Sequence, residues 1–230
     1  MDERYCLFIG PNRIFTSVFP FRLDDVEGAL EEVRKAARDR QVVRVEWWIG
    51  PDAEPSDLHD RLLGLGLEAK RDSHVASMVL VDEPPAADPA VTARAVLSIE
   101  ELRAAVELGL EAFGDAEWRR EIALANIADD WEREGQLIRN FLAFVDGEPV
   151  GSARTAYLEQ GAVLLISGAV LERARGRGAY RALVRARWDD AAERGTPALI
   201  VHAGRMSRPI LERLGFQAVA EIDVLEDALR

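Results

Sequence analysis

The fold of this 230-residue chain is decided by one stretch, Leu171-Glu172-Arg173-Ala174-Arg175-Gly176-Arg177-Gly178-Ala179-Tyr180. It follows an apolar run at 162–170 and opens a periodic helical segment at 180–194. A strand, a glycine-rich turn and a helix start form a phosphate site, because glycine lets backbone N–H groups approach an anion and the helix N-terminus adds partial positive charge. Three arginines add full charges. We therefore predict that this stretch binds a phosphate-bearing ligand.

Composition indicates a globular protein with a sizeable core, since 48% of the residues are hydrophobic. The formal net charge is −12, which argues against general nucleic-acid binding, because phosphate backbones are bound by clustered Lys and Arg. The acidity has two interpretations that the sequence leaves open. It serves solubility, or it forms an acidic groove that attracts a cationic substrate.

The N-terminus predicts a cytoplasmic protein without membrane association. Residues 1–5 are charged where a signal peptide would be apolar, and no uncharged run approaches the ~20 residues that span a bilayer. Cys6 is the only cysteine, so no internal disulfide can form. His59, His74 and His202 are too far apart in the sequence for a local metal motif, and we expect no metal.

Three prolines and no bulky apolar residue mark 82–90 as an extended connector. We predict an N-terminal domain at 1–85, a linker at 86–90 and a C-terminal domain at 91–230. Hydrophobic periodicity predicts a β-α-β-α-β order for the first domain. Its strands are expected at 14–23, 42–49 and 75–81, and its helices at 26–38 and from 56 to about 66.

The segment after the connector alternates strand and helix signals of an α/β (mixed α+β) fold. Strands are expected at 91–97, 141–145, 150–157, 162–170, 198–202 and 219–224, with a reversal at Asp146-Gly147. Helices are expected at 99–113, 116–132, 180–194 and 207–214. In the first of these helices the buried face should comprise Leu102, Val106, Leu110 and Phe113.

A faint repeat relates the two halves, since Leu62-x-x-Leu65-Gly66-Leu67 mirrors Leu211-x-x-Leu214-Gly215-Phe216. The first half has no glycine-rich turn. Its first helix starts with the carboxylates of Asp24, Asp25 and Glu27, which would repel a phosphate. If the halves share an ancestor, only the second retains the phosphate site.

Spacing separates the known phosphate motifs. The G-x-x-x-x-G-K-[ST] pattern is absent, and the dinucleotide pattern G-x-G-x-x-G fails because Arg181 occupies the third glycine position. The remaining R-G-x-G resembles the acyl-CoA pyrophosphate signature Q/R-x-x-G-x-G/A of the GNAT acetyltransferase superfamily. Arg175 matches its first position and Gly178 its second, whereas Tyr180 stands where the family has Gly or Ala.

The resemblance extends over 91–224, because the expected order of strands and helices is that of the GNAT fold. The ending Glu212-Arg213-Leu214-Gly215-Phe216 is also similar to the family's usual close. The smaller first domain then looks like a degenerate half of the same fold. This is an arrangement that some bacterial members of the family have.

The resemblance implies an N-acyltransferase that moves an acetyl or other short acyl group from acyl-CoA to an amine, by direct attack in a ternary complex. Its acceptor would be a small amine, cationic if the acidic residues form a groove, and the chain would be a monomer or homodimer. Acetyl-CoA would be held by Val170, Leu171, Glu172, Arg173, Arg175, Gly176, Arg177, Gly178, Ala179 and Tyr180. Taken alone, the glycines also fit an ordinary strand-to-helix turn, and the arginines an ordinary surface.

The catalytic residues are less defined. Many family members protonate the departing thiolate with a tyrosine where this chain has Leu211, and a family glutamate position holds Leu164. Ser207 is a candidate acid, or the N-cap of the last helix, and His202 is a core residue or a base. The base is not identified. These apolar replacements also favour an alternative, a non-catalytic acyl-CoA-binding sensor or partner-binding module.

Segments that border the expected acceptor groove contain three carboxylates, and the spacing selects none of them as the base. They are Glu117, Asp130 and Glu159.

Overall fold

The computed structural model describes residues 3–9, 16–158 and 161–229, without the side chains of 70–72. Its contacts divide the chain into two compact units. Unit 1 comprises Met1–Ser77, Ala203–Pro209 and Ala218–Arg230, and unit 2 comprises Met78–His202 and Ile210–Gln217. This division differs from the expected boundary at 86–90. The reason is that the C-terminal strand pairs with a strand of the N-terminal segment.

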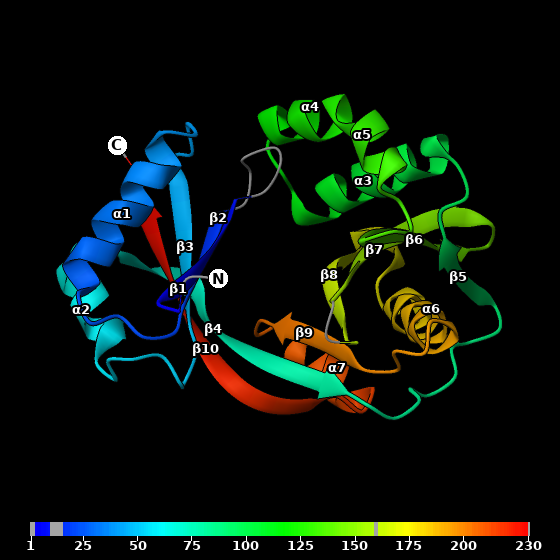
Figure 1. The fold of residues 1–230 in the computed structure, drawn as a ribbon. Helices are drawn as coiled ribbons and strands as arrows, with labels where there is room; N and C mark the ends of the chain where they lie inside the picture. The colour runs from blue at the N-terminus through cyan, green and yellow to red at the C-terminus, as the bar shows by residue number, and fades with distance from the viewer. Residues whose placement is uncertain (1–2, 10–15, 159–160, 230) are drawn as a thin grey trace. The chain divides into compact units, whose positions relative to one another are not determined.

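Unit 1 contains a sheet with the strand order β1-β2-β3-β10-β4 and two helices (Figure 1). Strands β3 and β10 pair antiparallel, from Arg44 opposite Ala228 to Ile49 opposite Asp223. Strands β4 and β10 also contribute residues to unit 2. The elements are β1 (Tyr5–Ile9), β2 (Thr16–Pro20), α1 (Val26–Arg38), β3 (Arg44–Ile49), α2 (Leu58–Gly64), β4 (Glu68–Leu80) and β10 (Gln217–Ala228).

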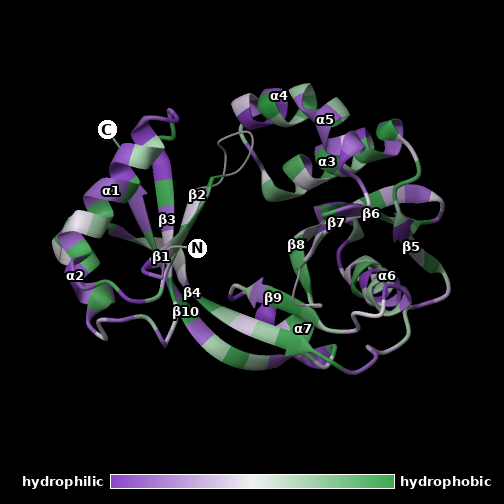
Figure 2. Cartoon of the chain, in the orientation of Figure 1, coloured by the Kyte–Doolittle hydropathy of each residue, from purple (hydrophilic) through white to green (hydrophobic). Residues whose placement is uncertain are grey.

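Helix α1 has the bounds that the sequence predicts, and its ends explain why. The Asp25 carboxylate accepts a hydrogen bond from the Gly28 N–H at 2.9 Å, and Lys35 and Arg38 lie in the last turn, where cations are favoured. Apolar residues recur at helical spacing, which appears as green bands among purple along α1 (Figure 2). They pack on a core that includes the fully buried Trp47.

Unit 2 contains strands in the order β4-β9-β8-β7-β6-β5. All neighbouring pairs from β5 to β8 are antiparallel, and β8 pairs with β9 in parallel. Its elements are β5 (Val91–Ala95), α3 (Ile99–Phe113), α4 (Glu117–Ala125), α5 (Ile127–Glu132), β6 (Ile138–Val145), β7 (Glu148–Tyr157), β8 (Val163–Val170), the 3-10 turn η1 (Glu172–Ala174), α6 (Ala179–Glu193), β9 (Leu199–Ala203) and α7 (Arg208–Arg213).

Alternation along β6 assigns its two faces to two helical layers, because successive side chains of a strand point to opposite faces. Phe141, Ala143 and Val145 belong to the core cluster that includes residues of α6. Leu142 and the partly buried Phe144 belong to the cluster that includes residues of α3 and α5. Helix α6 thus covers one face of this part of the sheet, and α3 to α5 cover the other (Figure 1).

The hairpin prediction is confirmed. Strands β6 and β7 are joined by Asp146 and Gly147, whose φ angles of 54° and 82° are those of a type I′ turn.

The prediction of a single helix at 116–132 is wrong. Helices α4 and α5 are separated at Asn126, whose side-chain amide donates to the Ile122 carbonyl at 2.7 Å. Such a bond competes with regular helix geometry. Phe113, expected to be buried, is 57% exposed.

Strand β1 was not predicted, and it carries the exposed Cys6. It pairs with β2, with Cys6 opposite Phe19.

No helix in the described ranges is both long and apolar enough to cross a membrane.

Candidate functional site

The predicted phosphate site has the backbone that an anion site requires. After β8 and η1 the chain is extended at Arg175 and then turns through Gly176 and Gly178, with φ of 78° and 89°. Such φ values strain residues that have a Cβ. Gly178 is the N-cap of α6, and no described side chain caps this helix. The first N–H groups of a 15-residue helix are therefore left for another partner.

A hollow of about 340 Å³ lies at this turn. Its lining residues are Asp88, Gly176, Arg177, Gly178 and Arg181. Arg181 was not counted among the binding arginines in the sequence analysis, and its side chain has no ion pair or hydrogen bond with another residue that the structure describes. Its guanidinium is therefore available to a ligand.

The three predicted arginines have partners of their own. Arg173 pairs with Glu111 at 3.3 Å and Arg177 with Asp146 at 2.7 Å, in exposed ion pairs. The Arg175 Nε donates to the Val170 carbonyl at 3.3 Å and so ties the turn to the end of β8. Arg177 and Asp146 connect the turn to the β6–β7 hairpin. These contacts position the turn and leave Arg181 to face the hollow.

The connector packs beside this turn rather than extending freely. Arg185 of α6 pairs with Glu83 at 2.6 Å and donates to the Pro84 carbonyl at 3.3 Å. The Asp88 carboxylate accepts from the Ala90 N–H at 2.9 Å, and Asp88 is one of the residues that line the hollow. One negative charge therefore lies beside the positive charges of Arg177 and Arg181.

Strands β8 and β9 pair over only three residues each and then part. Their register runs from Val163 opposite Leu199 to Leu165 opposite Val201. Beyond that point β8 is irregular, because its register with β7 shifts and Ser167 has a φ of 51°. The Leu171 N–H donates to the Val150 carbonyl at 2.9 Å, so of these two neighbouring amides at the end of β8 the Val170 N–H is the candidate to bind a ligand.

A charged residue that the sequence analysis missed lies behind this irregular segment. Arg187 of α6 is 1% exposed, in line with the buried Leu183 and Ala191 on the same face of the helix. A Cβ added at Gly168 of β8 would lie 3.5 Å from the Arg187 Nη2 and 3.4 Å from the Tyr180 ring. The available signal was an arginine four residues after Leu183, on an otherwise apolar helical stripe.

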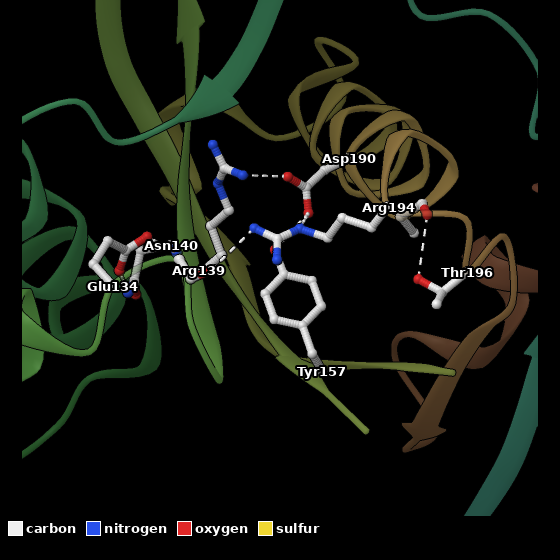
Figure 3. Close-up of polar contacts among 9 residues, drawn as sticks. Glu134, Arg139, Asn140, Tyr157, Asp190, Arg194 and Thr196 are labelled. Atoms are coloured by element: carbon white, nitrogen blue, oxygen red, sulfur yellow. Dashed lines mark hydrogen bonds and ion pairs between the residues drawn. The ribbon is translucent and has the colours of Figure 1, made fainter. Parts of the chain in front are cut away.

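A second polar cluster anchors the C-terminal end of α6 (Figure 3). The Tyr157 hydroxyl donates to Asp190 at 2.5 Å, and Arg139 pairs with the same carboxylate at 2.6 Å. Arg194 lies 3.4 Å from Asp190, and its guanidinium stacks 3.9 Å from the Tyr157 ring centre. Burial, followed by the Asp190 carboxylate, raises the pKa of Tyr157. This cluster joins α6 to β6 and β7, and its groups satisfy one another.

The opposite face of β6 and β7 carries a carboxylate network. Glu134 accepts from the Asn140 N–H at 2.8 Å and from its side-chain amide at 2.6 Å, and burial raises the pKa of Glu134. Arg154 donates to the Asn140 Oδ1 at 3.1 Å and lies 3.8 Å from Asp130. Glu117 is exposed in the first turn of α4. Glu159 lies outside the described residues, and the base stays unidentified.

The other candidate residues have plain surroundings. The Ser207 hydroxyl donates to the Gly204 carbonyl at 3.2 Å, and Ser207 belongs to unit 1, whereas the glycine turn belongs to unit 2. Burial lowers the pKa of His202. Leu211 of α7 is fully buried. The described residues contain no group of three or more His, Cys, Asp or Glu side chains that could hold a metal ion.

Comparison with known proteins gives the same family that the motif indicates. The family model described as Acetyltransferase (GNAT) family matches residues 102–216. No curated protein matches the sequence. A GCN5-related N-acetyltransferase from Kribbella flavida is structurally similar over 98% of this chain and 89% of its own, with a TM-score of 0.75 and 20% identity.

Two further solved structures extend this likeness. A GCN5-related N-acetyltransferase from Sphaerobacter thermophilus is similar over 98% of this chain and 76% of its own chain, with a TM-score of 0.68 and 19% sequence identity. A tandem GNAT protein from the clavulanic acid biosynthesis pathway covers 93%, with 75% of its own chain, a TM-score of 0.61 and 13% identity. At these identities the structures establish the fold, and the sequence match covers half of the chain. The chain belongs to the GNAT acetyltransferase family.

Proposed function

We propose that the protein is an N-acyltransferase that moves an acetyl or other short acyl group from acyl-CoA to a small amine. The observation that carries this proposal is the glycine turn at the uncapped start of α6. It faces a hollow lined by Arg181, and it follows β8, the strand that pairs with β9 over only three residues. Backbone amides, a helix N-terminus and an arginine suit a diphosphate.

In this proposal the residues from Val170 to Tyr180 hold the coenzyme mainly through the main chain. The N–H groups around Gly176 and Gly178 bind the diphosphate. Arg181 supplies a positive charge to it, because Arg173 and Arg177 are already paired with carboxylates. Glu172 and Ala179 contribute backbone only. The Val170 N–H is suited to polarise the thioester carbonyl and to stabilise the negative charge that develops on its oxygen.

Direct attack by the amine requires no covalent nucleophile from the protein. Acyl-CoA supplies an activated acyl group with a thiol of roughly cysteine-like pKa, about 8.5, as its leaving group. The protein's task is then to orient two substrates, which by itself accounts for a large part of such rate accelerations. A neutral amine must be delivered, and the proton that it gives up must pass to a carboxylate or to water.

The test is calorimetric titration with acetyl-CoA, followed by incubation with a panel of small amines while free thiol is measured. We expect saturable binding and thiol release with at least one amine, with cationic amines favoured by the acidic charge. Flat heats and an unchanged melting temperature would contradict the proposal. Gel filtration with light scattering tests the expected monomer or homodimer.

The alternative function is a non-catalytic acyl-CoA-binding sensor. It is favoured by the buried, apolar Leu211 and by Leu164, which stand where the resemblance places an acid and a carboxylate. This alternative predicts acetyl-CoA affinity without thiol release, whichever amine is added. The amine panel therefore separates the two functions. A role of Ser207 as acid belongs to the first function only, and Ser207→Ala should then slow thiol release without loss of affinity.

We also propose that the N-terminal segment is a degenerate copy of the same fold. Support comes from the Leu-x-x-Leu-Gly repeat at 62–66 and 211–215, and from the likeness of nearly the whole chain to a tandem GNAT protein. In that case the chain holds one acyl-CoA molecule, and calorimetry should give one site per chain. We expect the protein in the cytoplasm, without nucleic-acid or membrane partners.

A further inference from the structure

A buried cation without a carboxylate is the most unusual feature of unit 2. The Arg187 guanidinium is 1% exposed, and its Nε donates to the Leu183 carbonyl of the preceding helical turn at 3.0 Å. Its Nη2 has no hydrogen-bond partner among the residues that the structure describes. Burying an uncompensated charge is costly, so such a group is rarely retained for packing alone.

The one side chain of the described residues that favours the charged form of Arg187 is Tyr180. Burial lowers the pKa of Arg187, and the Tyr180 side chain opposes this effect by hydrogen bonding and by charge. The two residues are seven positions apart on one face of α6, and both lie against Gly168, where only a hydrogen occupies the side-chain position. Tyr180 is half-buried, whereas Arg187 is fully buried.

The position of Tyr180 places it between the two ends of the proposed coenzyme site. It follows Gly178 of the glycine turn by two residues, and its ring contacts β8 at Gly168, two residues before Val170. Two residues of a regular strand span about 6.6 Å, so the Tyr180 ring lies roughly one such step along β8 from the amide suited to hold a thioester. A phenol that is half-buried here and backed by a cation is suited to donate a proton.

We propose that Tyr180 is the proton donor to the departing thiolate of coenzyme A, and that Arg187 is the positioning residue that supports the resulting phenolate. This inference rests on the proposed function and adds a named acid to it. The amine nitrogen forms a bond to the acyl carbon, and the C–S bond breaks with its electron pair on sulfur. The Tyr180 proton moves to sulfur, and the phenolate beside Arg187 takes up the proton that the acylated amine releases.

The first test measures binding, because it needs no acceptor. Free coenzyme A and desulfo-coenzyme A are titrated calorimetrically at pH 7.5 in two buffers of different ionisation heat. The two buffers give the number of protons released on binding, and the difference in this number between the two ligands isolates the protons that come from the thiol. A donor at sulfur favours the thiolate, and lowering a thiol pKa of about 8.5 by one unit releases about 0.4 proton at this pH. We expect this release for the wild type, its loss in Tyr180→Phe, and a smaller value in Arg187→Met.

The second test measures turnover with the best amine. Tyr180→Phe retains the ring on Gly168 and removes only the hydroxyl, so kcat should fall about 100-fold or more with little change in KM for acetyl-CoA. Arg187→Met should reduce kcat and alter its pH profile, while the unfolding midpoint of the free protein stays the same or rises. Arg185→Met is the matched control, since Arg185 lies on the same helix in partly exposed ion pairs with Glu83 and Asp189.

The outcomes separate the two proposals. If the wild type binds no coenzyme A, the proposed function fails and this inference fails with it. If the coenzyme binds but Tyr180→Phe keeps the same thiol-linked proton release and a kcat within twofold of the wild type, Tyr180 is not the donor and only the present inference is overturned. An unfolded Arg187→Met protein would show that the cation stabilises the fold, which also contradicts its assigned role.

Discussion

Arg34 of α1 and Asp227 of β10 are 193 positions apart and form a two-pronged ion pair, with both N–O distances at 2.9 Å. The Asp227 side chain is 4% exposed and that of Arg34 is 20% exposed. The pair therefore joins the last strand of the chain to its first helix inside unit 1. This contact, together with the β3–β10 pairing, explains why the compact units do not follow the order of the sequence.

Removing one partner of this pair should be costly. Arg34→Met leaves the Asp227 carboxylate buried and unpaired, and because Arg34 is partly solvated we expect a loss of about 2–3 kcal/mol in the free energy of unfolding, below the usual range for buried pairs. Urea denaturation measures it. Arg4→Met, which breaks a pair with Glu32 that is half exposed on both sides, should cost under about 1 kcal/mol. Equal losses of unfolding free energy in the two variants would show that the burial of Asp227 does not set the cost of breaking its ion pair.

Arg181 should contribute more to acetyl-CoA affinity than Arg173. Arg181 lines the hollow without a protein partner, whereas Arg173 is paired with Glu111 on an exposed surface. A hydrogen bond to a charged group contributes about 1.5–3 kcal/mol, so Arg181→Ala should raise the dissociation constant roughly tenfold or more. Arg173→Ala should change it less than about threefold. Calorimetry with both variants decides, and the reverse ranking would contradict this assignment.

The backbone at Gly178 should tolerate no side chain without cost. A Cβ there would meet only Val91 at 3.9 Å, so space is available, but the φ of 89° strains any other residue. Gly178→Ala should therefore lower the free energy of unfolding by about 1–2 kcal/mol and weaken acetyl-CoA binding, because the strain is relieved by moving the N–H groups of the turn. Gly64→Ala, in helix α2 with open space around it, should not weaken binding.

Stability should fall at acidic pH through Glu101. Its hydrogen bonds from Arg94, together with one from the Leu97 N–H, hold its pKa at about 2, against an ordinary value of 4.5. The folded pKa is the lower one, so the unfolded chain binds more protons between these values, and the contribution present above pH 4.5 is lost as the pH falls toward 2. Arg94→Met should cost about 0.5–1 kcal/mol at pH 7 and much less at pH 3. A pH-independent difference would contradict this.

Much of the fold could be predicted from the sequence because its signals are local. Helix α1 and helix α3 have the predicted bounds, since a capping side chain and an apolar stripe define each of them. The Asp146-Gly147 turn was recognisable because few residues adopt positive φ at both positions. The family followed from R-G-x-G together with the order of the elements. These features depend on neighbours within a few residues.

The parts that could not be predicted depend on partners distant in the sequence. The break at Asn126 depends on one side-chain hydrogen bond, and the partners of Arg173 and Arg177 are 62 and 31 positions away. The apolar stripe of α6 marks Arg187 as unusual, but its contact with Gly168 depends on how the helix packs on β8. Binding roles of the residues in 170–180, and of Ser207, stay predictions that the titrations above test.

The exposed thiol of Cys6 has a practical consequence for every experiment that counts sulfhydryl groups. It is the single cysteine of the chain, and its side chain is open to reagents. A colorimetric assay of coenzyme release will therefore register one equivalent from the catalyst itself, and air oxidation can couple two chains covalently through this position. A Cys6→Ser variant removes both artefacts. In the unsubstituted chain, Cys6 offers a unique attachment point for a fluorescent label.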